Sequence, residues 1–134
     1  MSNYAGLCHY YLKNYPKAIE QYQKAAELDP KILTNYFYNN IGMAYAKNGQ
    51  LDDAEQAFQE YQNLFPDDGR TYRNWAMFYA LKGDKEKALS NLQKAIGLGY
   101  DDLEWLTTDD SLESIRKEKV YLQLVAELQK RKDS

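Results

Sequence analysis

Apolar residues between positions 41 and 61 recur at the spacing of two amphipathic helices. The apolar positions, three or four residues apart on either side of a polar break, are Ile41, Ala44, Tyr45, Leu51, Ala54, Phe58 and Tyr61. The break itself, Lys47-Asn48-Gly49, ends in a residue that readily takes the left-handed conformation of a helix C-terminus. The stretch therefore predicts a helix, a turn and a second helix.

The same arrangement occurs three times along the chain. The first unit carries Gly6, His9, Ala18, Tyr22, Ala25 and Pro30, and the second carries Gly42, Tyr45, Ala54, Phe58, Tyr61 and Pro66, each 36 positions later. The third unit carries Ala76, Tyr79, Ala88, Leu92, Ala95 and Tyr100, each 34 positions after its counterpart. A fixed period of this length is the signature of a repeat protein. We expect helix pairs over about 1–30, 36–66 and 69–100, with the two extra residues of the first spacing in 31–35.

The positions of glycine and proline agree with this periodicity. Gly49 and Gly83 stand where a first helix should end, and Pro30 and Pro66 follow the predicted end of a second helix. The first unit has Lys13 in place of the turn glycine. Each unit is thus predicted to contain two separate helices and not one long one.

This pattern resembles the tetratricopeptide repeat, which places small residues at the glycine and alanine positions and a large aromatic residue between the alanines. The resemblance covers about residues 2–100, with departures at Lys13, Tyr61 and Tyr100. It implies an all-α, right-handed α-solenoid of three antiparallel helix pairs, in which small residues let the helices approach closely.

Beyond Tyr100 the repeat stops and a tail follows. Val120, Leu124 and Leu128 recur every fourth residue, flanked by Tyr121, Val125 and Ala126. A solenoid needs a terminal helix with a polar outer side to cover its last repeat. We therefore interpret 101–134 as a C-terminal cap, which makes 1–134 one domain. The tail also loosely resembles the terminal block of some bacterial repeat proteins.

Composition and charge make some classes of function less expected than others. The chain has 134 residues, 44% of them hydrophobic, which suffices for a core without disulfides, and its one cysteine, Cys8, is expected to be a small core residue. The formal charge of -3 has the wrong sign for broad attraction to nucleic acid. RNA binding is a minor alternative.

No catalytic, cofactor or metal site is predicted. His9, the only histidine, occupies the position of Tyr45 and Tyr79, so we interpret it as a packed ring, and a zinc site would need further ligands. Four carboxylate pairs, Asp52-Asp53, Asp67-Asp68, Asp101-Asp102 and Asp109-Asp110, precede or open predicted helices. Capping of free backbone amides explains them without acid–base chemistry or calcium. We expect Trp75 and Trp105 to be core residues. The chain is predicted not to be an enzyme.

The resemblance also implies a binding surface, because first helices line the concave groove of tetratricopeptide repeat proteins. The positions carried over from the family are Asn3, Leu7, Tyr10, Tyr11, Tyr36, Asn39, Asn40, Met43, Lys47, Arg70, Arg73, Asn74 and Met77. Amide, aromatic and thioether groups suit an extended peptide, since asparagine pairs with both backbone donors and acceptors. Asn40 and Asn74 are the most distinctive pair. Only Asn40 and Arg70 match the clamp with which some members hold chaperone C-termini, so that ligand is not expected.

The predicted function is therefore a protein- or peptide-binding scaffold with a partner of unknown identity. The alternative is an oligomerisation or spacer segment of a larger protein with an empty groove. The first helix starts near Met1 with no polar helix before it, so Tyr4, Leu7 and Tyr11 could support a homodimer. No run of apolar residues is long enough to span a bilayer. A cytoplasmic location is expected only if the chain is complete.

Overall fold

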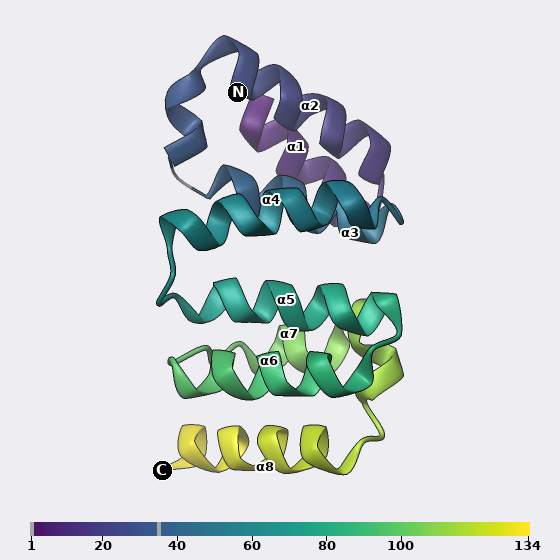
Figure 1. Cartoon of the computed structure of the whole chain (residues 1–134), viewed down its shortest axis with the longest axis vertical. Coiled ribbons are helices and arrows are strands. Elements are labelled where there is room, and N and C mark those ends of the chain that lie inside the picture. Colours follow the sequence, from purple (N-terminus) through teal and green to yellow (C-terminus); the bar gives the residue numbers. More distant parts are fainter. Residues whose placement is uncertain (1, 35) are drawn as a thin grey trace. The chain divides into compact units, whose positions relative to one another are not determined.

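The regular elements of the described chain are all helical. The computed structural model describes residues 2–34 and 36–134, and side chains from residue 5 onward except those of residues 32 and 34. The elements are α1 (Ser2–Tyr11), α2 (Tyr15–Leu28), the 3₁₀ helix η1 (Pro30–Thr34), α3 (Phe37–Lys47), α4 (Leu51–Leu64), α5 (Gly69–Lys82), α6 (Lys85–Gly97), α7 (Leu103–Thr108), the 3₁₀ helix η2 (Asp110–Ile115) and α8 (Lys119–Asp133) (Figure 1). The all-α class and the three helix pairs are as predicted. The chain divides into two compact units, Met1–Pro66 and Asp67–Ser134.

The first unit contains two of the helix pairs. Helix α1 packs on α2, α3 packs on α4, and α2 also packs on α3. The buried cluster that joins them consists of Ala18, Ile19, Tyr22, Phe37, Ile41, Ala44 and Ala57. The two extra residues of the first spacing fall at η1, the short helix between α2 and α3.

Close approach within a pair depends on the predicted small residues. A Cβ atom added to Gly6 would lie 2.6 Å from Cδ1 of Tyr22, and one added to Gly42 would lie 2.5 Å from Cε1 of Phe58. Real Cβ atoms do not approach other atoms so closely, so each glycine makes room for the ring on its partner helix.

The turns inside the pairs have the predicted left-handed backbone. Gly83 ends α5 with φ 91°, and Gly49 has φ 80°. Lys13, at the same position of the first pair, also has a positive φ of 62°. The geometry of the turn is therefore retained where the glycine is not, at a cost in backbone strain.

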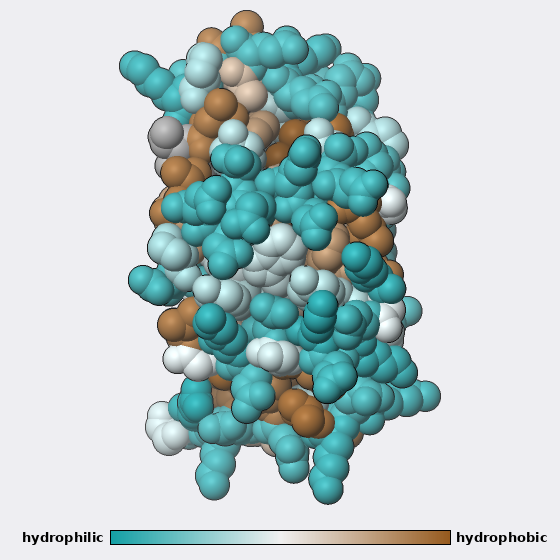
Figure 2. All heavy atoms as spheres, in the orientation of Figure 1, coloured by the Kyte–Doolittle hydropathy of each residue, from teal (hydrophilic) through white to brown (hydrophobic). Residues whose placement is uncertain are grey.

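The second unit contains the third helix pair and the tail. Helix α6 packs on α5 and on α8, and α7 also packs on α8. Tyr121, Leu124 and Leu128 of α8 join Leu92 and Ile96 of α6 in one buried cluster. The surface over α8 is mainly hydrophilic in Figure 2. Helix α8 covers the last repeat, which confirms the predicted C-terminal cap.

Three expectations about single residues were wrong. Val120 was assigned to the buried stripe of α8 but is 40% exposed, and Tyr121 takes its place and donates a hydrogen bond of 2.8 Å to the carbonyl of Leu106. Cys8 is exposed and does not fill the core. Asp52 and Asp53 lie in the first turn of α4, whose N-cap is Gln50 without a side-chain hydrogen bond, so this pair does not cap.

The other three carboxylate pairs behave as predicted. Asp68, Asp102 and Asp109 are the N-caps of α5, α7 and η2, and each accepts a hydrogen bond from a backbone amide of the first turn. No helix of the described residues is both long enough and apolar enough to cross a membrane.

Candidate functional site

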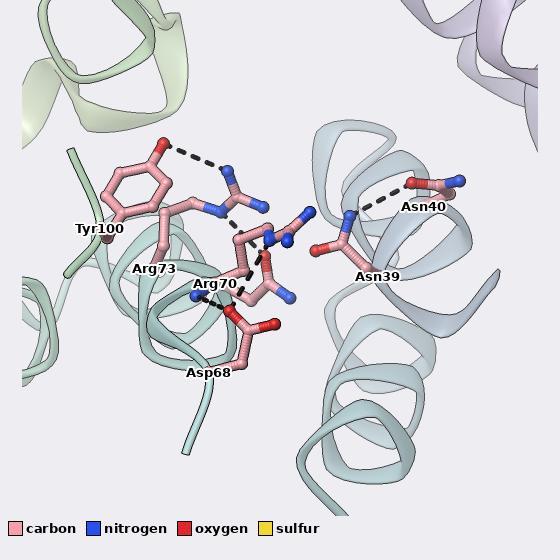
Figure 3. A network of polar contacts seen from close by, with 7 residues as sticks. Asn39, Asn40, Asp68, Arg70, Arg73 and Tyr100 are labelled. Carbon is pink, nitrogen blue, oxygen red and sulfur yellow. Dashed lines mark hydrogen bonds and ion pairs between the residues drawn. The ribbon is translucent and has the colours of Figure 1, made fainter. Parts of the chain in front are cut away.

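The candidate positions on α3 form a partly exposed polar and aromatic surface. The side chain of Asn40 is half-buried and accepts a hydrogen bond of 3.2 Å from Nδ2 of Asn39, which is itself buried (Figure 3). Tyr36 is 40% exposed and its ring stacks on Phe65 at 5.8 Å between centroids. This stacking fixes the direction of an exposed aromatic ring next to an amide.

Five further candidates with described side chains lie on α3 and α1 and differ in their exposure. Lys47 and Leu7 are half-buried, whereas Met43 is buried. On α1, Tyr10 is half-buried and makes an edge-to-face contact of 5.7 Å with Tyr11, which is 74% exposed. The side chain of Asn3 lies outside the described residues.

On α5, Arg70 is the candidate with an exposed guanidinium. Its Nε lies 3.6 Å from Oδ1 of Asp68, and its backbone amide donates a hydrogen bond of 2.9 Å to the same oxygen (Figure 3). The N-cap of α5 therefore holds the base of this side chain. The guanidinium remains exposed beside a helix N-terminus.

Arg73, one turn later, is enclosed by aromatic rings of the second unit. Its guanidinium carbon lies 5.2 Å from the ring centre of Tyr100 and 5.0 Å from that of Trp105. Its Nη1 donates a hydrogen bond of 3.2 Å to the Tyr100 hydroxyl, and its Nε donates one of 3.0 Å to Oδ1 of Asn74. Burial raises the pKa of Tyr100, while the charge of Arg73 acts in the opposite direction. Arg73 thus links α5 to the segment after α6.

The exposure expected for several of these residues is corrected by the structure. Asn74 and Met77 are fully buried, and Arg73 is 6% exposed. Trp105, expected in the core, is only half-buried and lies against Arg73, whereas Trp75 is buried as expected. Sequence spacing identified the helix but could not show which of its polar residues have partners inside the fold. The exposed candidates are Tyr11, Tyr36 and Arg70, and the half-buried ones are Leu7, Tyr10, Asn40 and Lys47.

Potential metal ligands do not cluster among the described residues. No three side chains of His, Cys, Asp or Glu gather closely enough there to hold a metal ion. His9 is half-buried on α1 and contributes, after Lys24 and Lys17, to lowering the pKa of Glu20. The arrangement offers hydrogen-bonding groups and rings for recognition.

One feature of the first unit was missed by the sequence reasoning. A groove of about 950 Å³ lies between α2 and α4, with residues of α3 at its base. It was missed because the candidates were chosen only from first helices, whereas its walls come from the second helices. Small residues at Ala26 and Ala57, beside acidic and amide side chains, were the available signal.

Comparison with known proteins shows that the first two repeats match a known family. The sequence model described as "Tetratricopeptide repeat" matches residues 2–32 and 36–68. The chain is 32% identical over 88 residues to the photosystem I assembly protein Ycf3 of Prochlorococcus marinus (strain NATL1A), covering 63% of this chain and 51% of that protein. It is 29% identical over 94 residues to the cell division cycle protein 27 homolog of Caenorhabditis elegans, covering 70% of this chain and 12% of that protein.

Among solved structures, MamA MSR-1 C2 has a similar fold. The TM-score is 0.60 at 28% sequence identity, over 72% of this chain and 55% of that one. The chain spans about half the length of the Ycf3 protein that it matches. The helical-repeat architecture is therefore shared with known proteins, and the similarity covers part of each.

Proposed function

Because residues 2–32 and 36–68 are tetratricopeptide repeats, we propose that this chain is a protein-interaction module that binds an extended peptide segment of another protein. The observation that carries the proposal is the surface on α3, where an oriented, exposed ring lies beside an amide that can both donate and accept. Tyr36 offers a flat apolar face, and Asn40 can pair with a peptide backbone. Such groups recognise a ligand without transforming it.

In the second unit, the first helix of the third repeat offers a separate position for binding. Arg70 stands at the N-terminus of α5, where the helix dipole and the guanidinium both favour negative charge. Asp68 neutralises part of this charge, so we propose that this position of the second unit has a moderate preference for acidic side chains. Buried Asn39 and Met43 hold the shape of the surface on α3 and leave its chemistry to their exposed neighbours.

The name of one matched relative agrees with a role in holding other proteins. It is a photosystem I assembly protein. We propose from this that the chain holds another protein. Because its helices are ordered before binding, most of the conformational entropy lost on binding would come from the ligand.

A peptide library displayed on phage provides the test. Peptides selected on the wild-type protein would be synthesised, labelled and titrated by fluorescence anisotropy against Tyr36→Ala and Asn40→Ala variants. Each variant should bind about tenfold more weakly, because Tyr36→Ala loses an apolar contact and Asn40→Ala a polar one. Gln93→Ala on the exposed side of α6 is the matched control and should bind as the wild type does.

Circular dichroism must show equal helicity for all three variants. Peptides that bind all variants with wild-type affinity would contradict the proposed surface. Loss of binding in Gln93→Ala alone would place the ligand on the second helices.

A further inference from the structure

The groove between α2 and α4 has a chemical character unlike that of the proposed peptide surface. Its base consists of Phe37, Tyr38, Ile41 and Tyr45, at positions that share one side of α3. Tyr38 and Tyr45 are half-buried. The base is therefore an apolar stripe about two turns long that keeps part of its surface accessible.

The walls of the groove are acidic. Its carboxylates are Glu27 from α2 and Asp53 and Glu60 from α4, and no described residue that lines it is basic. Among the residues that the structure describes, neither Glu27 nor Glu60 is engaged in an ion pair. Glu27 also lies in the last turn of α2, where the helix dipole disfavours negative charge. The groove thus holds uncompensated negative charge above an apolar base.

The remaining wall residues allow close approach. Ala26 and Ala57 present short side chains from opposite walls, and the amides of Gln56 and Gln59 are exposed. Gln23 donates a hydrogen bond of 3.0 Å to the Tyr45 hydroxyl, so the wall and base hold each other in place. With about 950 Å³ of space, the groove can take several side chains of a ligand.

We infer that this groove binds a basic amphipathic helix of a partner protein. It would be a second binding site, with walls from α2 and α4, the second helices of the first two repeats. The apolar side of the incoming helix would pack on the α3 stripe between the two alanines. Its lysine or arginine side chains would lie beside Glu27 and Glu60. Ridges of side chains on one helix fit grooves between others, and the charge decides which helices are accepted.

The test uses two synthetic probes with the chain of residues 1–134. One is an amphipathic peptide with leucine on one side and lysine on the other, and the second has every lysine replaced by glutamate. Titration by fluorescence anisotropy should show binding of the lysine peptide and none of the glutamate peptide. The Glu27→Gln/Glu60→Gln variant should bind the lysine peptide roughly three- to tenfold more weakly, as expected for two exposed charge contacts.

Glu55→Gln is the matched control, because Glu55 is an exposed carboxylate of α4 that does not line the groove. It should leave affinity unchanged. An Ala26→Arg variant, which fills the groove and adds positive charge, should abolish binding. Equal weakening by Glu55→Gln, or wild-type affinity in the Ala26→Arg variant, would overturn the inference.

Amide chemical shifts separate this site from the proposed peptide surface. The lysine peptide should shift resonances of Gln23, Tyr38 and Gln56, while those of Asn40 and Arg70 stay in place. The reverse pattern would overturn the second site. Self-association that the Glu27→Gln/Glu60→Gln variant removes would also overturn it, because the occupant would then be another copy of the chain. If the phage-selected peptides bind without depending on Asn40, the proposed function fails, but the result with the lysine peptide is unaffected.

Discussion

At the scale of single residues, each helix pair contains one small residue opposite one large residue. The first two pairs combine glycine with an aromatic ring, as Gly42 does with Phe58. The third combines Ala76 with the smaller Leu92, both in one buried cluster. Volume lost on one helix is thus matched by volume gained on the other, as close packing requires.

Gly42→Ala tests this match. With Phe58 retained, the new methyl group should meet the Phe58 ring and destabilise the protein by about 1 kcal/mol. This value is the difference between the cost of overpacking and the better helix propensity of alanine. In a Phe58→Leu background the same substitution should stabilise by up to about 1 kcal/mol, because leucine leaves room for it. Urea denaturation of the four proteins measures both effects. Equal effects in the two backgrounds would show that the residues do not interact.

Tyr22 holds a hydroxyl group inside the first unit. It is fully buried, and its oxygen has no hydrogen-bond partner among the described residues. Burial, with smaller contributions from Tyr11 and Cys8, raises the pKa of Tyr22 above its ordinary value near 10. The folded protein therefore strongly favours the neutral phenol.

Tyr22→Phe should consequently stabilise the protein by about 1 kcal/mol at pH 7, by removing a buried polar group without a partner. A second effect appears at high pH. Since the folded state holds the phenol proton more tightly, the stability linked to Tyr22 is complete below about pH 10 and is lost as the pH rises further. Thermal denaturation from pH 7 to 11 should show a smaller decline for Tyr22→Phe. Parallel declines would show that Tyr22 ionises freely in the folded protein.

At the scale of elements, the tail shows how a helix becomes a cap. Helix α8 buries Tyr121, Leu124 and Leu128 but leaves Leu122 54% exposed. Its last turn carries Lys130, Arg131 and Lys132, whose charge suits a helix C-terminus. One side of the helix completes the core of the second unit, and the other faces water.

Leu128→Ala should therefore destabilise the protein by about 2–5 kcal/mol, because it opens a cavity beneath α8. Leu122→Ala on the same helix removes the same atoms from a mostly exposed position, and its effect should stay within about 0.5 kcal/mol. Chemical denaturation compares the two. Similar losses would mean that α8 does not cover the last repeat.

At the scale of the whole molecule, exposed apolar side chains remain at the end of α1. Tyr11 is 74% exposed and Leu12 is 76% exposed, next to the strained turn at Lys13. Adjacent exposed apolar residues of this size favour contact with another protein surface. A second copy of the chain is the simplest such surface in a purified sample.

We expect the purified protein to self-associate at high concentration and the Tyr11→Ser/Leu12→Ser variant to remain monomeric. Sedimentation velocity over a range of concentrations measures this directly. The exposed leucine of α8 supplies the control, because Leu122→Ser should associate as the wild type does. A monomeric wild type at all concentrations would contradict the expectation.

The sequence by itself determined the paired helices of the three repeats and the capping helix, but not the short helices η1 and α7. Helical periodicity, proline and glycine positions, and a fixed repeat spacing all act over a few residues, so they can be recognised without knowing which helices touch. The match of Gly42 to Phe58 follows from the same spacing. The left-handed turn at Lys13 could be predicted because the other pairs have glycine there.

Tertiary structure alone decided which polar side chains are available to a ligand. Arg73 and Asn74 are residue types common on protein surfaces, but two rings from distant positions in the sequence enclose Arg73, and Asn74 is fully buried. Val120 and Cys8 are exposed because the rotation of each helix about its axis is set by its neighbours. The groove between α2 and α4 likewise exists only once two helices far apart in sequence share α3 as a base. Burial and grooves depend on contacts between helices, which local periodicity does not encode.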